Sequence, residues 1–394
     1  MSRGLGLWRS LRQSLNLPCF LCGADGPGHI DSLPGVQRAE FLRVAPEAVL
    51  RHLLFCASLA GLSAAVVAAM IRVGVLDQPV ARSSHTRPTP KGGGVGVVAA
   101  FLVGIVALYA FADFSRIADP YFRGVIGASV GIAVVSYLDD VRDWPFAVKL
   151  GAQAVAALVA VGSGLAPHAL RVPWVGAVEI GWLGIPATVA WILVLTNAVN
   201  FIDGLNGLAA GSVAIACLFL AGIAAGQGDW FVYFAAAILA SGVLGFLPFN
   251  YPRARIFMSD VGSQFCGFTL AVLGVAAGRF AAVELSLLLM PMLLAGVLFD
   301  VAFTLARRLL GGRRITEAHR GHLYQVASRC GMGAAGVTLV YWGFVIWGGL
   351  SCMGFVQAPS GARLWWAMLV VPPQIAWLAT VCVLARRSGL RDWG

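Results

Sequence analysis

The chain has 394 residues, of which 59% are hydrophobic and only 12% are charged, and its formal net charge is +10. Soluble domains carry about twice that share of charged residues, so this composition excludes an ordinary soluble domain and indicates a polytopic membrane protein. The basic residues lie between apolar segments and not on one soluble face. The positive charge therefore predicts membrane topology and not binding to nucleic acid.

Residues 1–50 differ from the rest of the chain. They are mixed in polarity and contain Gly-Pro turns, and we expect no cleavable signal peptide, because the first apolar patch is short and is interrupted by Arg9 and Arg12. We predict a poorly ordered N-terminal extension over residues 1–50.

From residue 51 onward, apolar runs long enough to cross a bilayer, about 20 residues each, follow one another. We predict an all-α, polytopic transmembrane bundle of about 11 spans over residues 51–385, followed by a basic tail at 386–394. The expected spans are near 51–72, 94–112, 122–138, 149–165, 183–199, 208–226, 230–249, 264–279, 284–306, 335–355 and 364–385. Residues 166–182, with Pro167 and Pro173, are expected to form a short extramembrane hairpin or interfacial stretch.

The connecting segments divide unequally in basic residues. One side of the membrane receives seventeen and the other receives five, so the positive-inside rule places the first side, and the C-terminus, in the cytoplasm. The seventeen are Arg72, Arg82, Arg87, Lys91, Arg142, Lys149, Arg253, Arg255, Arg307, Arg308, Arg313, Arg314, Arg320, Arg329, Arg386, Arg387 and Arg391. The five are Arg116, Arg123, Arg171, Arg279 and Arg363.

The same division gathers acidic residues on the cytoplasmic side, at or just beyond the ends of spans. They are Asp77, Asp139, Asp140, Asp143, Asp203, Asp260 and Glu317, and Asp300 lies inside the ninth span near that face. Acids beside apolar helices are costly unless they are solvated, paired or bound to metal. Any one of them is explained as a helix cap or a loop charge, but the whole set predicts a cation site.

The first cytoplasmic loop carries Arg82, Ser83, Ser84, His85 and Lys91 ahead of three glycines, 92–94, that open the second span. Glycines allow backbone amides to approach an anion, and the start of a helix adds positive potential. An ordinary positive-inside loop with a glycine hinge is the plain alternative. The density of hydroxyl, imidazole and cationic groups favours phosphate binding.

The second and third loops carry carboxylates and amides. Asp139 and Asp140 are adjacent at a span end, and neighbouring carboxylates require a cation or a shared proton. Asn197, Asn200 and Asp203 recur at helical spacing, so they share one face of a helix end. Mg²⁺ binds carboxylates together with phosphate oxygens and water, and amide groups suit a sugar, a phosphate or a bound water.

The last two loops complete the set. Asp260 lies between apolar residues at the start of a span, where it is either the N-cap of the helix, a metal ligand or both. His319, Arg320 and His322 follow in the final cytoplasmic loop. Two histidines at this spacing could bind zinc, but no cysteine or third histidine is near, so binding of a diphosphate is favoured.

These motifs are RSSHxxPTPxGGG, LDDVRD, NxxNFxDGxxGLA, FMSDVGS and AHRGHLYQ, in this order over residues 50–335. Together they resemble the bacterial polyprenyl-phosphate N-acetylhexosamine-1-phosphate transferases, glycosyltransferase family 4. The peptidoglycan branch carries a triple-His stretch where this chain has His-Arg-Gly-His, so the resemblance is closer to the branch that starts O-antigen and exopolysaccharide carriers.

The resemblance implies an all-helical bundle in the bacterial inner membrane with a cytoplasmic active-site cleft. It implies that a UDP-N-acetylhexosamine donates its sugar-1-phosphate to undecaprenyl phosphate and that UMP leaves. It implies Mg²⁺, with Mn²⁺ as the alternative, held by Asp260 and Asp203, with Asp139, Asp140 and Asp203 as catalytic residues. Substrate contacts are expected from Arg82, Ser83, Ser84, His85, Lys91, Asn197, Asn200, His319, Arg320 and His322.

Other readings stay open. A phospho-MurNAc-pentapeptide transferase of the peptidoglycan branch is the enzymatic alternative, and an organic-anion transporter is the alternative of another class. A transporter places its binding residues near the middle of the bilayer and often has repeat symmetry, whereas the polar motifs here lie at one face and no repeat is visible. The sequence also leaves open whether the protein is a homodimer.

Overall fold

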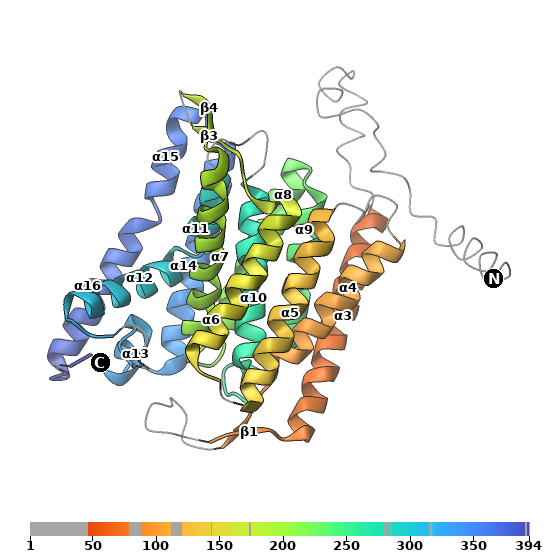
Figure 1. The fold of residues 1–394 in the computed structure, drawn as a ribbon. Helices are drawn as coiled ribbons and strands as arrows, with labels where there is room; N and C mark the ends of the chain where they lie inside the picture. The colour runs from red at the N-terminus through yellow and green to blue at the C-terminus, as the bar shows by residue number, and fades with distance from the viewer. Residues whose placement is uncertain are drawn as a thin grey trace.

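The computed structural model describes residues 46–78, 88–111, 120–142, 144–172, 175–278, 283, 286–314, 317, 319–390 and 392–393. The described chain is an all-α bundle with two small hairpins (Figure 1). This confirms the predicted fold class. Most of the predicted N-terminal extension, residues 1–45, lies outside the described residues, and residues 46–50 form the first turns of α3.

The helices follow the predicted apolar runs. They are α3 (Pro46–Val73), α4 (Gly94–Phe111), α5 (Pro120–Arg142), α6 (Phe146–Ala160), α7 (Gly184–Phe201), α8 (Leu208–Gln227), α9 (Trp230–Asn250), α10 (Ser259–Ala277), α11 (Leu289–Leu293), α12 (Ala295–Leu310), α13 (Leu323–Arg329), α14 (Ala334–Gln357), α15 (Ser360–Met368) and α16 (Val371–Arg387). A π-helical turn, Val161–Leu165, extends α6, and a 3₁₀ turn, Gly181–Leu183, precedes α7.

Within the described residues, nine helical segments are long and apolar enough to cross a membrane, and a tenth is counted if one bent pair forms a single span. The second predicted span, α4, is a shorter apolar helix. The ninth differs from the prediction of one continuous span over 284–306, because Ser286–Leu293 and Ala295–Leu310 are bent by 75°. The break lies at Leu294, whose φ of −105° and ψ of 23° are not helical.

Two antiparallel hairpins mark the two ends of the bundle (Figure 1). At one end, β1 (Leu76–Asp77) pairs with β2 (Thr89–Pro90), in the loop between α3 and α4. At the other end, β3 (Ala169–Val172) pairs with β4 (Gly176–Glu179). The second hairpin confirms the short hairpin expected at 166–182. The end that carries β1, β2 and α13 is called the basic end below, since it holds the loops that are rich in arginine.

Helix α10 lies at the centre of the bundle. Over an 18-residue apolar segment of each helix, 89% of the residues of α10 are buried, whereas only 17% of the residues of α3 are buried. Small residues permit this packing: α4 and α10 approach so closely that a Cβ on Gly94 would lie 2.2 Å from the Cα of Gly262. The outward faces of the peripheral helices carry exposed leucine and valine, as contact with lipid requires.

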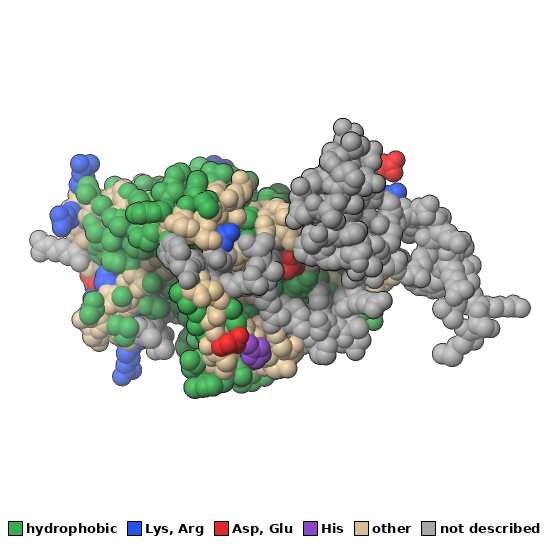
Figure 2. Space-filling view, turned by 90° about the horizontal axis from the view of Figure 1, so that it is seen from above, with side chains coloured by type: hydrophobic (Ala, Val, Ile, Leu, Met, Phe, Trp, Pro, Cys, Tyr) green, Lys and Arg blue, Asp and Glu red, His purple; other side chains and the backbone are tan. Residues whose placement is uncertain are grey.

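Seen from the end that carries β3 and β4, the described surface is largely hydrophobic and its charged side chains are scattered (Figure 2). This view contains no gathered set of carboxylates among the coloured residues. The clustered acids of the sequence lie instead at the basic end, where α5 and α7 finish and α10 begins.

Candidate active site

Three helix ends meet at the basic end and bring the predicted carboxylates together. Asp139 and Asp140 occupy the last turn of α5, and Asp260 occupies the first turn of α10. Asp203 follows the end of α7 and interacts electrostatically with Asp260 and Asp140. Residues up to 121 positions apart in sequence thus form one group, which we call the carboxylate cluster: Asp139, Asp140, Asp203 and Asp260.

Lys149 bridges two members of this cluster from the first turn of α6. Its Nζ atom lies 2.5 Å from Oδ2 of Asp139 and 3.0 Å from Oδ2 of Asp260. From its position at a span border, Lys149 was predicted only as a contributor to topology, although the rarity of lysine in this chain is a further signal. Of 28 lysines and arginines only two are lysines, Lys91 and Lys149, and Lys91 interacts electrostatically with Asp140. The chain therefore uses compact ammonium groups at this cluster and guanidinium groups elsewhere.

Asp140 and not Asp260 caps α10. The Asp140 carboxylate accepts from the backbone N–H of Asp260 at 3.3 Å and of Val261 at 3.2 Å. The N-cap position belongs to Met258, so the expectation that Asp260 is the N-cap is wrong. A carboxylate at this position satisfies free amides and favours the positive end of the helix. The side chain of Asp260 is therefore available for other interactions.

The glycine triplet anchors the start of α10. Gly93 N–H donates to the carbonyl of Phe257 at 2.8 Å, and Gly94 N–H donates to that of Met258 at 3.0 Å. Gly92 N–H donates to the hydroxyl of Ser259, which is at φ +63°. The expectation that these amides face an anion is wrong, since all three are bonded inside the protein. Their effect is to fix the backbone immediately before Asp260.

Amide side chains surround Asp260. Asn200 Nδ2 donates to its Oδ1 at 3.0 Å and to the hydroxyl of Ser263 at 2.9 Å, and Gln264 Nε2 donates to its Oδ2 at 3.0 Å. Gln153 connects this group to the predicted residue Asn197. Its Nε2 donates to Oε1 of Gln264 at 3.1 Å, and its Oε1 accepts from Nδ2 of Asn197 at 2.6 Å. Sequence reasoning missed Gln153 and Gln264, although a polar residue inside an apolar span is itself a functional signal.

The loop after α7 holds Asp203 beside the other acids. Desolvation by the surrounding helices raises the pKa of Asp203 well above its ordinary value, and the charges of Asp260 and Asp140 raise it further. A carboxyl group in this setting gains from a nearby cation, because a cation offsets both the lost water and the like charges. The group therefore favours a cation or a proton at Asp203.

The final cytoplasmic motif lies next to this loop. The rings of His319 and His322 stack at 5.0 Å, and His322 lies 5.8 Å from the ring of Phe201 at the end of α7. Burial lowers the pKa of His319 to about 4, and His322, Arg308 and Arg307 contribute to the same shift. His319 is thus neutral near pH 7. Arg320, between the two histidines, is partly buried and its carbonyl accepts from Arg329.

Tyr324 connects the histidine motif to the carboxylate cluster. Its hydroxyl donates to the carbonyl of Phe201 at 2.9 Å and fills the space beside Gly204, where a Cβ would lie 2.2 Å from the hydroxyl oxygen. Asp203 lies between Phe201 and Gly204 in the sequence, and it interacts electrostatically with Tyr324. The structure therefore brings the third and fifth predicted motifs together.

The remaining predictions for the site divide in two. Arg82, Ser83, Ser84 and His85 lie outside the described residues, so their placement stays a prediction. Asp143 lies outside them as well. Within the described part of the chain, no three His, Cys, Asp or Glu side chains converge closely enough to hold a metal by themselves. The oxygen donors of the cluster instead suit an ion that is completed by water and by a ligand.

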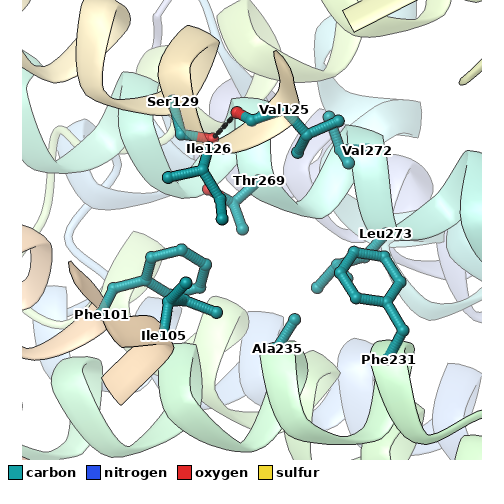
Figure 3. Close-up of a pocket in the computed structure, with 10 residues that line it drawn as sticks. All are labelled: Phe101, Ile105, Val125, Ile126, Ser129, Phe231, Ala235, Thr269, Val272 and Leu273. Carbon is teal, nitrogen blue, oxygen red and sulfur yellow. Dashed lines mark hydrogen bonds between the residues drawn. The ribbon is translucent and has the colours of Figure 1, made fainter. Parts of the chain in front are cut away.

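A separate apolar cavity lies between α4, α5, α9 and α10 (Figure 3). It is lined by side chains such as Phe101, Ile105 and Phe231, with the hydroxyls of Ser129 and Thr269. Ser129 precedes Asp140 on α5 by eleven residues, or about 16 Å along a helix. Both hydroxyls donate to carbonyls of their own helices, so neither has a hydrogen left to donate to a ligand in the cavity.

Comparison with known proteins places these motifs in a family. The Glycosyl transferase family 4 profile matches residues 122–278. A probable undecaprenyl-phosphate N-acetylglucosaminyl 1-phosphate transferase of Bacillus subtilis is 32% identical over 256 residues, which cover 64% of this chain and 70% of that protein. A decaprenyl-phosphate N-acetylglucosaminephosphotransferase of Mycobacterium tuberculosis is 32% identical over 347 residues, covering 80% and 84%. A phospho-N-acetylmuramoyl-pentapeptide-transferase of Acetivibrio thermocellus is 34% identical over 180 residues, covering 43% and 51%.

Proposed function

Because the chain belongs to glycosyl transferase family 4, among the polyprenyl-phosphate N-acetylhexosamine-1-phosphate transferases, we propose that it transfers N-acetylhexosamine-1-phosphate from a UDP-sugar to undecaprenyl or another polyprenyl phosphate. UMP is the second product. The observation that carries the proposal is the carboxylate cluster with its two lysines at one end of a membrane bundle.

The reaction joins two anions. An oxygen of the polyprenyl phosphate attacks the β-phosphorus of the UDP-sugar, and the bond from that phosphorus to the bridging oxygen breaks, so that UMP leaves with the bridging oxygen. The attacking phosphate needs little activation, because its second pKa is about 6. Catalysis then depends on positioning both phosphates and on offsetting their charge.

The oxygen donors of the cluster fit Mg²⁺, and Mn²⁺ is the alternative. Asp260 and Asp203 are the proposed ligands, and Mg²⁺ is usually held by one or two carboxylates with water and substrate phosphates. The absence of a three-ligand group among the described side chains is consistent with this mode. When bound, the ion neutralises the phosphate charge that develops during transfer.

The protein's own cations have a complementary task. Lys149 holds Asp139 and Asp260 in place, and Lys91 reaches the neighbourhood of Asp140. We assign Asp139, Asp140 and Asp203 to catalysis. The proposed substrate contacts are Arg82, Ser83, Ser84, His85, Lys91, Asn197, Asn200, His319, Arg320 and His322.

His319 donates or accepts as a neutral ring near pH 7, whereas Arg320 supplies a permanent charge and a planar set of donors that matches a phosphate. Asn200 orients Asp260 through its amide. These assignments place an anion-binding motif beside a metal-binding one, which is the arrangement that a diphosphate substrate needs.

The distribution of charge supports a proposed setting for the reaction. The basic end faces the cytoplasm of a bacterial inner membrane under the positive-inside rule, where nucleotide sugars are available. The polymer is an O-antigen, an exopolysaccharide or another envelope glycan. The peptidoglycan branch is the second candidate, because a pentapeptide transferase also aligns. It is less favoured, since its match covers 51% of that relative against 84% for the mycobacterial enzyme.

The proposal is tested by Asp260→Asn in parallel with Asp229→Asn. Asp229 is the N-cap of α9 and accepts from Val232 N–H at 2.9 Å, and asparagine is a comparable cap, so this control should keep its activity. Asp260→Asn should lower UMP release by about 1,000-fold or more, because a neutral amide is a poor ligand for a hard cation. Near-normal turnover in Asp260→Asn would remove Asp260 from metal binding.

A further inference from the structure

One buried carboxylate lies outside the carboxylate cluster. Asp300, in α12, has no exposed surface, and five donors converge on its two oxygens. Oδ1 receives Leu323 N–H at 2.8 Å, Thr304 Oγ1 at 3.1 Å and His322 Nδ1 at 3.2 Å. Oδ2 receives Tyr324 N–H at 3.2 Å and the hydroxyl of Tyr341. No lysine or arginine among the described residues forms an ion pair with it.

This geometry determines the state of His322. Backbone amides can only donate, and the hydroxyls of Thr304 and Tyr341 are directed at the same carboxylate. A carboxylate surrounded by donors is ionised and accepts from each of them. The Nδ1 atom of His322 must then carry a hydrogen, and Nε2 is the ring nitrogen left to meet a ligand.

Asp300 also fixes the element that carries this histidine. It accepts from the first two amides of α13, Leu323 and Tyr324, and Tyr324 in turn bonds the carbonyl of Phe201 two residues before Asp203. A single buried side chain thus links the ring of His322 with the helix that packs against the Asp203 loop.

We propose that Asp300 is a positioning residue of the transferase, which holds His322 with Nδ1–H directed inward and Nε2 directed to the phosphates of the substrate. The proposal rests on the proposed function. Asp300 acts through His322 and does not touch the substrate itself. The functional result is a histidine of one tautomer at a fixed angle, as is common where a carboxylate supports a reactive imidazole.

A purely structural role for Asp300 makes a different prediction. If it only stabilised α13, its loss would lower protein stability, and the loss of activity would be the same whether or not His322 were present. If it acts through His322, its loss should have little further effect once the imidazole is gone, because residues that act as a unit are not additive.

The kinetic test is a double-mutant cycle with Asp300→Asn, His322→Asn and the double variant, each measured for UMP release and for thermal unfolding. Asp300→Asn should lower kcat by about 10–100-fold, the range for a residue that supports a catalytic ligand. In the His322→Asn background the same change should cost less than about 3-fold. Thr304→Val, which removes a different donor from Asp300, is the matched control and should stay within about 3-fold of wild type.

A second measurement does not depend on activity or on folding of the variants. Imidazole ¹⁵N NMR of the wild-type protein in detergent should show His322 protonated at Nδ1 between pH 6 and 8. A signal from the Nε2–H tautomer, or equal losses from Asp300→Asn in both backgrounds, would overturn the proposal. Absence of UMP release by the wild-type protein would instead refute the proposed function and leave the tautomer result standing.

Discussion

Replacing Lys149 by methionine removes the ammonium and keeps the length of the side chain. In the structure this ammonium lies 2.5 Å from Asp139 and 3.0 Å from Asp260. Asp139 is 3% exposed, so its charge loses its partner without gaining much water. Removing one member of a buried pair costs about 3–5 kcal/mol. Because Lys149 itself keeps 24% exposure, we expect a smaller loss of about 2–3 kcal/mol in the free energy of unfolding.

The variant should also respond differently to divalent cations. With the ammonium gone, the carboxylates of Asp139 and Asp260 should bind Mg²⁺ more tightly in the absence of substrate. Binding to the native state stabilises it by about 2.7 kcal/mol at a free concentration of 100 times Kd. Raising MgCl₂ should therefore recover more of the thermal stability of Lys149→Met than the same addition gives to the wild type.

The assay is thermal unfolding of purified protein in detergent, followed by tryptophan fluorescence, with EDTA and across a MgCl₂ series. Lys149→Arg is the matched control, since it keeps the charge and should keep most of the stability. UMP release should fall by about 100-fold in Lys149→Met, equivalent to about 2.7 kcal/mol in the activation barrier. Equal unfolding temperatures in EDTA, together with equal responses to MgCl₂, would refute the bridging role of Lys149.

Two further predictions follow from the histidine motif and from the end of the chain. His319 titrates at about pH 4 in the folded protein against an ordinary value of 6.5, so the unfolded chain binds a proton first as the pH falls. The unfolding temperature should therefore fall as the pH is lowered from about 6.5 to 4. His319→Asn should make this fall smaller, and an unchanged pH dependence in that variant would contradict the burial of His319. Removal of residues 388–394 eliminates the 3.0 Å ion pair of Asp392 with Arg313 and the ring of Trp393 beside Arg307. This truncation should lower the unfolding temperature and raise KM for the UDP-sugar. Asp392→Asn alone should have a small effect, because its ion pair with Arg313 is exposed. Wild-type values after the truncation would show that residues 388–394 do not support the histidine motif.

The sequence was sufficient for the helices and for the end of the bundle where the acids lie. Apolar runs of bilayer length predict helices directly, because backbone N–H and C=O groups without hydrogen-bond partners are not tolerated in lipid. The hairpin near residues 169–179 was also predicted from its prolines and polarity. The alternation of loops across the membrane then placed the five motifs on one side, and the structure joins those of Asp139, Asp203, Asp260 and His322.

Contacts that depend on the packing of separate helices were not readable from the sequence. Lys149 contacts Asp139 and Asp260 only because the end of α5 lies beside the starts of α6 and α10. The amides of the glycine triplet 92–94, at the start of α4, were expected to face an anion, but packing of α4 against α10 directs them to residues 257–259 of the same chain. Likewise, the capping interaction was not predictable, because the carboxylate that accepts from the amides of Asp260 and Val261 belongs to Asp140 on another helix.

The break in the ninth span has a similar origin. Mean hydropathy alone treats 284–306 as one run, whereas the chain bends by 75° at Leu294. Asp300, in the helix that follows this bend, accepts hydrogen bonds from the first two amides of α13. Local composition could not predict this meeting, because it joins residues more than 20 positions apart.

The most direct test of the central claim is to identify the nucleotide that leaves. Purified protein is incubated with undecaprenyl phosphate, MgCl₂ and a panel of UDP-N-acetylhexosamines, and the nucleotide and lipid products are separated and quantified. The account predicts UMP, released in equal amount to a polyprenyl diphosphoryl sugar and only when both substrates and the divalent cation are present. Release of UDP, or no nucleotide product with any sugar of the panel while the protein remains folded, would contradict it.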